Sequence, residues 1–435
     1  MPRQGKINSS VAAHKLSVLL RARVVLPISR PPIEDGAIAI SGNRILAVGK
    51  WKDLSRRRSG RVVELGEVIL LPGLVNSHCH LDYTAMAGQL APAKKFTDWL
   101  KLITTSKGGW TYSDFAESWL EGANMLVRTG TTTVADIEMV PELLPDVWTS
   151  TPLRVMSFLE MTGIRSGRPP KEIIREALEK IKSLPKGHCR MGLSPHAPYS
   201  TKPELLRLAA NASRRQRLLV TTHVAESEQE FDMFNDRRGD MFDWLARNQR
   251  DMSDCGIGTP VQHMERQGAL NEKLLAVHVN YLGPGDAALL GRRKVNVVHC
   301  PRSHTYFRHQ PFPLAQLLSA RVNICLGTDS LASVYKARKR SVELSMFDEM
   351  RELASRMPSL PPEKILQMAT INGARALGRT GEIGEFCRQA FADMITIPLA
   401  GKPVEAFEEV VYHRGQVTAS MIDGQWVVPP PGLNT

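Results

Sequence analysis

Two histidines separated by one residue end an apolar run of the chain. The segment "LPGLVNSHCHLDYT" spans residues 71–84 and contains His78 and His80. Side chains alternate across an extended strand, so these two imidazoles point to one face and Cys79 points to the other. Paired imidazoles on one face of a buried strand are typical ligands of a divalent metal ion. The motif therefore indicates half of a metal site, whose other ligands must come from elsewhere in the chain.

Polar residues also end several other apolar segments of the chain. They are His196, His223 with Glu226 three positions later, His278, His299 and Asp329. A single strand histidine is more often a hydrogen-bonded core residue than a ligand, and we interpret His299 and His304 in that way. Burying many imidazoles and carboxylates together costs roughly several kcal/mol unless they are paired or bind a metal.

Four of these residues form a suitable set of metal ligands. His78, His80, His223 and Asp329 supply three neutral nitrogens and one carboxylate. This set suits zinc, with Fe2+ as an alternative, and leaves one coordination position for water. We therefore predict a metal site.

The elements that must position these residues alternate along the middle of the chain. Apolar, β-branched segments at 68–78, 131–137, 153–161, 189–195, 218–226, 274–282, 294–301 and 321–330 are separated by amphipathic stretches at 113–129, 169–183, 203–216, 229–248 and 341–356. Such alternation predicts parallel strands with crossover helices, and eight repeats favour an α/β protein of the (β/α)8 (TIM) barrel type over an open sheet. In that fold the carboxyl ends of the strands build the active site.

The two ends of the chain have a different pattern. Short strand-like segments fill the region before residue 70, with a Gly42-Asn43 turn that indicates an antiparallel hairpin. The last residues, including 408–428, have a similar strand-like pattern. We predict a small β-sandwich domain built from 16–70 plus 388–435, and a metal-dependent catalytic barrel at 71–387.

Composition excludes several classes of protein. The apolar fraction of 43% and the charged fraction of 23% are those of a soluble globular chain, and no stretch is apolar enough to suggest a membrane partner. The six cysteines include no CxxC pair, and the basic start of the chain has no cleavage site, so we expect a reducing, cytoplasmic location. The net charge of +12 comes from scattered clusters without interleaved aromatic residues, which argues against nucleic acid as a partner.

The chain also resembles a known family. "LPGLVNSHCHLD", "SPHAPYS", "HVAE", "HVNYL", "HCPRS" and "LGTDSLAS" resemble, in this order, motifs of the amidohydrolase superfamily. The similarity runs from about residue 16 to 430 and is closest to the aminohydrolase and chlorohydrolase branch, which includes guanine, cytosine and adenosine-type deaminases. Members with two metals usually carry a modified lysine at the end of the fourth strand. Residues 192–196 read "GLSPH" without a lysine, so we expect one metal ion.

The catalytic roles follow from this chemistry, and the resemblance agrees with them. A bound metal ion lowers the pKa of its water, and Asp329 binds the metal and accepts the water's proton. Glu226 carries a proton to a ring nitrogen, metal-bound hydroxide attacks the ring carbon, and ammonia leaves. The resemblance assigns His278 to the developing tetrahedral centre.

Substrate contacts are less sharply defined by the sequence. His196 resembles the family's substrate-contacting histidine. Trp99 is a candidate for stacking on a heterocycle, with core packing as the alternative, and Arg302 is a candidate for binding a carboxylate or phosphate, with a plain salt bridge as the alternative. Many relatives have Asn where this chain has His304 and Val334, which weakens the transfer of a substrate from any one relative.

The predicted function is hydrolytic deamination of an amino-substituted heterocycle. We favour an adenine nucleoside, either a 5′-modified adenosine or aminofutalosine. A triazine chlorohydrolase or a guanine deaminase is the alternative among enzymes, and a non-catalytic barrel that serves as a binding protein is the alternative of another class. The expected partner is a small heterocyclic molecule, and the sequence leaves homo-oligomer formation open.

Overall fold

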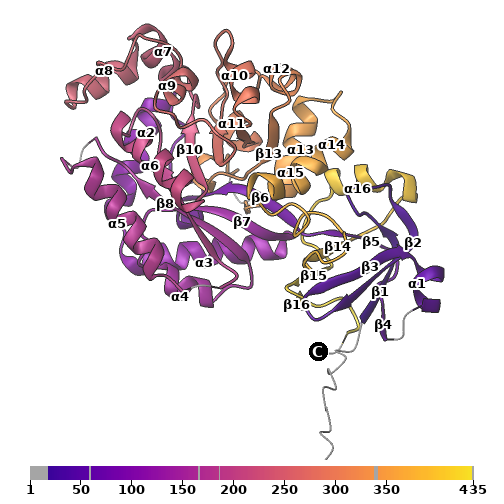
Figure 1. The fold of residues 1–435 in the computed structure, drawn as a ribbon. Helices are drawn as coiled ribbons and strands as arrows, with labels where there is room; N and C mark the ends of the chain where they lie inside the picture. The colour runs from indigo at the N-terminus through magenta and orange to yellow at the C-terminus, as the bar shows by residue number, and fades with distance from the viewer. Residues whose placement is uncertain (1–17, 58–59, 165–166, 186, 338–340, 434–435) are drawn as a thin grey trace, which may run out of the picture.

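A computed structural model describes residues 18–57, 60–164, 167–185, 187–337 and 341–433. The basic start of the chain and residues 16–17 of the predicted small domain lie outside these ranges. The chain forms two sheets, one inside a ring of helices and one made from both ends of the chain (Figure 1).

The first sheet has eight strands that are all parallel and follow one another in chain order. They are β6 (Leu74–Cys79), β7 (Thr131–Glu138), β8 (Arg154–Met161), β9 (Arg190–Pro195), β10 (Val220–Val224), β11 (Leu274–His278), β12 (Asn296–His299) and β13 (Asn323–Leu326). A parallel bridge between Cys79 and Asp329 joins the first strand to the segment after the last. The amide of Thr328 also donates to the carbonyl of His78 at 3.0 Å. The sheet therefore closes, and the predicted (β/α)8 barrel is confirmed.

Helices between these strands and after the last of them cover the outside of the barrel (Figure 1). They are α2 (Phe96–Lys107), α3 (Tyr112–Arg128), α4 (Leu144–Thr149), α5 (Pro170–Ser183), α6 (Pro203–Gln216), α7 (Glu228–Asp236), α8 (Asp240–Arg247), α9 (Pro260–Arg266), α10 (Asp286–Arg292), α11 (Pro301–Tyr306), α12 (Leu314–Ser319), α13 (Met346–Arg356), α14 (Pro362–Met368) and α15 (Ile371–Ala376). The helix predicted at 229–248 is divided into α7 and α8, because Arg237 and Gly239 take left-handed backbone angles (φ 55° and 94°) that a helix does not contain.

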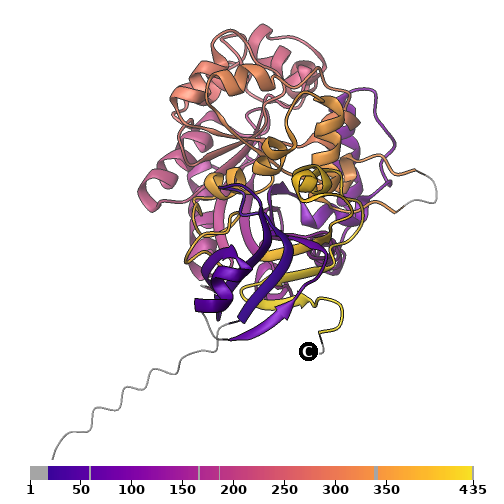
Figure 2. The same cartoon turned by 90° about the vertical axis from the view of Figure 1, so that its right-hand side faces the viewer.

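The second sheet combines strands from both ends of the chain, as predicted (Figure 2). Its members are β1 (Val18–Val25), β2 (Ile33–Ser41), β3 (Arg44–Lys50), β4 (Arg61–Glu64), β5 (Val68–Pro72), β14 (Met394–Pro398), β15 (Ala419–Ile422) and β16 (Gln425–Val428), with α1 (Trp51–Arg57) after β3. The first half of β1 pairs with β4 and its second half pairs with β5, so the sheet divides at β1. The hairpin of β2 and β3 is antiparallel, whereas β4 and β5 run parallel to β1.

Two segments differ from their predicted structure. Residues 68–78 form two strands in different sheets, separated at Gly73, where a Cβ atom would lie 2.1 Å from the Thr132 side chain. The start of 408–428 is not a strand but belongs to α16 (Ala406–Tyr412). Its buried residues Ala406 and Val410 are four positions apart, which is the spacing of a helix packed by one face.

The exact domain boundaries stay a prediction. The described ranges also contain short 3-10 helices, namely η1 (Leu81–Met86), η2 (Leu331–Ser333) and η3 (Pro403–Glu405). Among the described residues, no helix has the length and apolar character needed to cross a membrane.

Candidate active site

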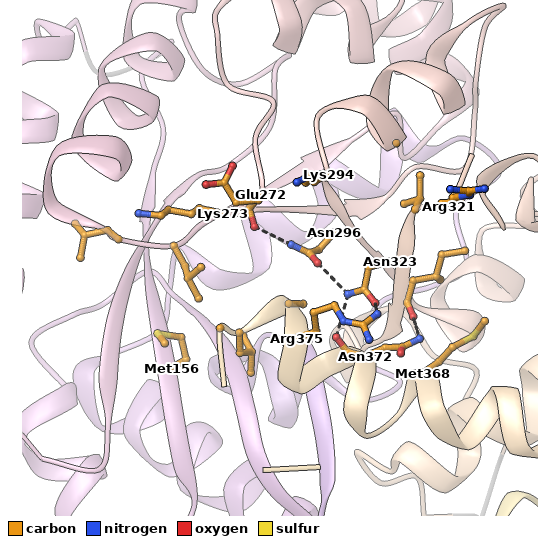
Figure 3. Close-up of a pocket in the computed structure, with 18 of the residues that line it drawn as sticks. Met156, Glu272, Lys273, Lys294, Asn296, Arg321, Asn323, Met368, Asn372 and Arg375 are labelled. Carbon is orange, nitrogen blue, oxygen red and sulfur yellow. Dashed lines mark hydrogen bonds between the residues drawn. The ribbon is translucent and has the colours of Figure 1, made fainter. Parts of the chain in front are cut away.

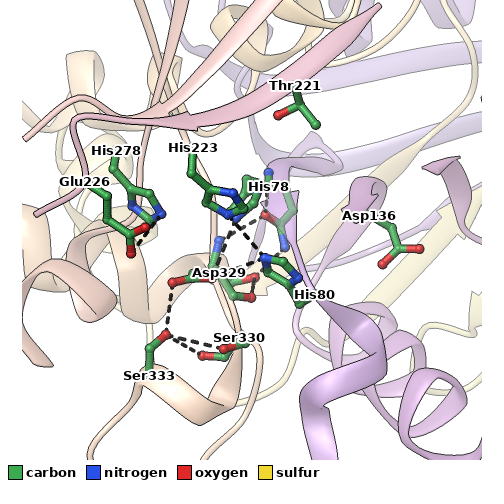
Figure 4. Close-up of polar contacts among 12 residues, drawn as sticks. His78, His80, Asp136, Thr221, His223, Glu226, His278, Asp329, Ser330 and Ser333 are labelled. Atoms are coloured by element: carbon green, nitrogen blue, oxygen red, sulfur yellow. Dashed lines mark hydrogen bonds and ion pairs between the residues drawn. The ribbon is translucent and has the colours of Figure 1, made fainter. Parts of the chain in front are cut away.

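Four of the predicted metal ligands meet at the carboxyl ends of the barrel strands (Figure 4). Nε2 of His78 and Nε2 of His80 lie 3.6 and 3.8 Å from Oδ1 of Asp329. Nε2 of His80 lies 3.4 Å from Nε2 of His223. His278 joins the group, since its ligand atom lies within 4.8 Å of those of His78 and His223. The first, fifth, sixth and eighth strands thus bring these nitrogens and one carboxylate to a single point.

The backbone places the first and last of these strand ends in direct contact. Gly327, in the "LGTDS" motif, packs against His78 so closely that a Cβ atom would lie 2.8 Å from the His78 carbonyl oxygen. Asp329 and His278 both have positive φ angles, of 54° and 73°. Such strained conformations of non-glycine residues cluster at functional sites, where the surrounding structure holds them.

The residues present fit a metal ion. His78 is fully buried, and both of its ring nitrogens lack a hydrogen-bond partner. A buried imidazole without partners is costly, and a cation at Nε2 would satisfy it. Nδ1 of His223 lies 2.8 Å from the carbonyl oxygen of His196, which leaves Nε2 free to bind a metal. Ser333 donates to Oδ2 of Asp329 at 3.0 Å, and Oδ1 faces the histidines.

The protonation states also suit a metal site. Burial lowers the pKa of His223 to about 3 and holds the pKa of His80 well below its usual value, so both rings are neutral, as metal ligands must be. Burial alone would raise the pKa of Asp329, but its close contact with His78, at 3.6 Å, and the other nearby imidazoles outweigh burial and hold the pKa well below the usual range. The site thus presents neutral nitrogens and one ionised carboxylate.

Glu226 differs from Asp329 in its environment. Burial raises the pKa of Glu226 well above its usual value, and the charges of Asp329 and Glu230 add to this effect. Oε1 of Glu226 lies 3.5 Å from Nε2 of His278. Two carboxyl groups at one site therefore have pKa values displaced in opposite directions, an arrangement that separates a proton carrier from a permanent anion.

A cavity of about 490 Å³ opens beside this cluster and contains two of the three predicted substrate contacts. His196 and Trp99 line it, together with His80, Glu226 and Asp329. Nδ1 of His196 is 2.6 Å from Oγ of Ser200, which leaves Nε2 as the ring nitrogen available to a ligand. Trp99 is largely buried against Phe307 and also lines the cavity. Its position therefore fits both core packing and a contact with a heterocycle in the cavity.

Arg302, the third predicted contact, lies on α11 and is not among the residues that line the cavity. Its guanidinium donates to the carbonyl of Glu343 at 2.8 Å and faces Asp348 and Glu349 on α13, which is the salt-bridge arrangement. His299 stacks on Phe312, with ring centroids 3.9 Å apart, and likewise does not line the cavity.

Sequence reasoning missed several polar residues of the cavity wall, among them Tyr83, Lys107 and Glu160. Glu160 comes one residue before the end of β8, so the rule that polar residues at strand ends build the site was a signal for it. Lys107 is the last residue of α2, the helix that also contains Trp99.

A second, larger cavity of about 930 Å³ lies at the opposite end of the barrel (Figure 3). It is lined by residues near the amino ends of the strands, such as Lys273, Asn296 and Asn323, and by Arg375. Asn296, Asn323 and Arg375 are joined there by hydrogen bonds. None of the clustered histidines or carboxylates lines this cavity, so size alone does not locate the chemistry.

A closed (β/α)8 barrel with a His/Asp cluster at its carboxyl mouth is the arrangement of a metal-dependent hydrolase. The chain matches the amidohydrolase family model over residues 69–427 and belongs to that family. It is 31% identical, over 84% of its length and 80% of the relative's, to the 5-methylthioadenosine/S-adenosylhomocysteine deaminase of Syntrophobacter fumaroxidans.

Two solved structures share the fold. An adenosine deaminase from Xanthomonas campestris with bound zinc has a TM-score of 0.81 and 26% identity, and the match covers 94% of this chain and 92% of that one. Aminofutalosine deaminase from Helicobacter pylori, in complex with methylthio-coformycin, has a TM-score of 0.83 and 19% identity, with 94% and 100% covered. The predicted superfamily and the predicted barrel architecture are confirmed.

Proposed function

We propose that this protein is a deaminase of adenine nucleosides that carry a modified 5′ position, and that it uses one divalent metal ion, zinc. The observation that carries the proposal is the buried cluster of His78, His80, His223 and Asp329, with Glu226 beside it and a cavity in front. The relative at 31% identity, named for methylthioadenosine and S-adenosylhomocysteine, supports this substrate class.

In this proposal the metal ligands and the proton carriers are different residues, except that Asp329 serves in both roles. His78, His80, His223 and Asp329 would hold the ion, which would lower the pKa of a bound water to about 7. Asp329, ionised at neutral pH, would accept a proton from that water and pass it to the amine that leaves as ammonia. Glu226 holds a proton at its raised pKa and delivers it to a ring nitrogen of the base. His278, 3.5 Å from Glu226, would donate to the oxygen that adds to the substituted ring carbon.

The compartment that we propose is the cytoplasm. All six cysteines are free thiols, and five of them are buried. Thiols of this kind persist in a reducing environment.

The experiment is a screen of ammonia release by the zinc-loaded protein. Adenosine, methylthioadenosine, S-adenosylhomocysteine, aminofutalosine, guanine and a chlorotriazine are the substrates. We expect release from the 5′-modified adenosines and a metal content near one ion per chain by elemental analysis. Turnover confined to guanine or to the triazine would replace the proposed substrate class, and two ions per chain would contradict the mononuclear site.

Removal of the metal separates the deaminase from a non-catalytic barrel. Chelation should abolish ammonia release, and one equivalent of zinc should restore it. A protein that binds the nucleosides with equal affinity in both states and never releases ammonia would be a binding protein.

A further inference from the structure

Lys107 occupies an unusual position in the wall of the active-site cavity. It is the last residue of α2, and its Nζ donates to the phenol oxygen of Tyr83 at 2.7 Å and lies 3.0 Å from Sδ of Met139. Both partners are neutral and weak acceptors for an ammonium group. Among the described residues, no carboxylate lies within ion-pair distance (4.0 Å) of Lys107 Nζ. A half-buried cation therefore lines the cavity with no carboxylate in direct contact, although it acts through space on the buried Asp82, whose pKa it lowers against the larger effect of burial.

The position of Lys107 relative to the metal cluster indicates which part of a bound substrate it would meet. The ring of Tyr83 stacks on the ring of His80, with centroids 5.2 Å apart and an angle of 3° between the planes. Lys107 Nζ lies beyond the hydroxyl edge of the Tyr83 ring, 2.7 Å from the phenol oxygen and 5.2 Å from the ring centroid. The Tyr83 side chain thus contacts both His80 and the ammonium, and all three residues line the cavity in front of the cluster. A nucleoside whose reacting carbon lies at the metal would extend along this wall.

The surroundings of Lys107 would strengthen an ionic contact. Leu100 and Ile103 of the same helix line the cavity beside it, together with Met139. An ion pair in such a partly apolar wall is less screened than one in open water. Glu160, on β8, lines the same cavity, and among the described residues its carboxylate has no ion-pair partner within 4.0 Å. Lys107 and Glu160 therefore do not form an ion pair with each other.

We propose that Lys107 binds a carboxylate at the end of the 5′ substituent, so that the enzyme prefers adenine nucleosides with an anionic tail over those with a neutral one. This inference rests on the proposed function, because that function places the base at the metal cluster. Two sources of the carboxylate fit: the amino-acid end of S-adenosylhomocysteine, whose ammonium would meet Glu160, and the aryl carboxylate of aminofutalosine, which has no ammonium. Methylthioadenosine has neither charge.

The test measures dissociation constants by calorimetry in zinc-loaded Glu226→Gln protein, which binds nucleosides without consuming them. Methylthioadenosine, S-adenosylhomocysteine and aminofutalosine are the probes. Lys107→Met should reduce the preference for a carboxylate-bearing probe over methylthioadenosine by about 10- to 100-fold, the value of a charge-assisted hydrogen bond. Lys107→Arg should restore most of that preference. Lys182→Met, which removes an exposed lysine of α5, is the matched control and should leave the preference unchanged.

Glu160→Gln distinguishes the two sources of the carboxylate. If this change weakens the binding of S-adenosylhomocysteine but not that of aminofutalosine, the amino-acid tail is the ligand that contacts both Lys107 and Glu160. The inference would be overturned if nucleosides with charged and with neutral 5′ substituents bound with equal affinity. It would also be overturned if the Lys107→Met variant kept the preference of the parent.

Ammonia release is assayed separately with the parent protein. If the binding preference depends on Lys107 but no ammonia is released, deamination is refuted and the carboxylate site is retained. If ammonia is released but the preference does not depend on Lys107, the proposed function is retained and the carboxylate site is refuted.

Discussion

Glu226 is positioned through its backbone, which leaves its side chain free to act. Its amide donates to Oε2 of Glu230 at 2.8 Å, and its carbonyl accepts from Nδ2 of Asn280 at 2.9 Å. The side chain itself contacts His278 at 3.5 Å and faces the cavity. Replacing the carboxyl group with an amide should therefore leave the surrounding structure and the metal ligands in place.

Glu226→Gln should keep its metal and lose turnover, because an amide cannot carry the proton that the ring nitrogen needs. We expect kcat to fall by roughly 100- to 10,000-fold, the usual contribution of general acid–base catalysis. Elemental analysis and ammonia release are the two measurements. Glu228→Gln, at an exposed position in the first turn of α7, is the control and should behave as the parent. Loss of zinc from the Glu226 variant would assign this residue to the metal instead.

Closure of the barrel depends on the contact between the ends of β6 and the segment after β13. Gly327 meets the His78 backbone with no room for a side chain. The amides of Thr328 and Asp329 then both donate to the His78 carbonyl, at 3.0 and 3.1 Å. One glycine therefore sets the distance between the first predicted ligand and the last.

Gly327→Ala should separate these two strand ends. The added methyl group would lie 2.8 Å from Cβ of His78, so the backbone must shift and carry Asp329 away from the histidines. We expect loss of bound zinc and a decrease of about 1–3 kcal/mol in the free energy of unfolding, the usual cost of overpacking. Elemental analysis and urea denaturation measure the two effects. Gly109→Ala, where a Cβ would meet nothing within 4 Å, is the control. An alanine variant with full zinc content would contradict this role of the glycine.

A buried acid joins α11 to α13 away from the metal cluster. Glu349 is fully buried and accepts from the amide of Arg302 at 2.9 Å. Burial raises the pKa of Glu349 well above its ordinary value of 4.5, although the nearby Arg302 guanidinium acts in the opposite direction. The native state therefore keeps a proton that the unfolded chain releases.

The contribution of Glu349 to stability should depend on pH. It is fully present below the ordinary pKa of 4.5 and is lost as the pH rises toward the raised native pKa, because only the unfolded state has then released its proton. Urea denaturation at a series of pH values measures this slope. Glu349→Gln should flatten it, whereas the exposed Glu363→Gln of α14 should not. The same slope in parent and Glu349 variant would show that Glu349 is ionised in the native state.

Over the whole molecule, one buried arginine connects the barrel to the sheet formed from the two ends of the chain. Arg154, at the start of β8, binds Asp393 in two contacts of 2.5 and 3.1 Å and Asp423 in a third of 2.6 Å. Asp393 precedes β14, and Asp423 lies in the turn between β15 and β16. The Arg154 guanidinium also lies over the ring of Phe391, at 3.7 Å. A single side chain thus joins two segments of the terminal sheet to the barrel.

Arg154→Ala should destabilise the whole protein, because it leaves the carboxylate of Asp393 buried without its partner. The expected loss is about 3–5 kcal/mol in the free energy of unfolding. Arg154→Lys should recover only part of it, since lysine cannot form the paired contacts. Urea denaturation measures both, with Arg175→Ala, an exposed ion-pair residue of α5, as a control of little effect. Unchanged denaturation of the alanine variant would mean that the two sheets are held together without this contact.

The pattern of the chain was enough to predict the barrel and the superfamily. Eight apolar segments that alternate with amphipathic stretches indicate the barrel, and the resemblance of motifs that contain residues such as His78 and Asp329 indicates the superfamily. Local pattern was insufficient at Gly73, where two sheets meet, and at α16, where packing of one face selects a helix in a strand-like sequence. Those outcomes depend on neighbours that are distant in the chain.

By itself, the sequence determined the types of residue at the strand ends and the order of the strands, because both follow from local hydrophobicity and spacing. Only the tertiary structure decided which of these residues face one another. It directed Arg302 toward α13, placed Lys107 and Glu160 in the cavity wall, and gave Glu226 and Asp329 opposite shifts in pKa. The physical reason is that burial, charge and hydrogen bonding act through space, between residues whose separation along the chain carries no information about their distance.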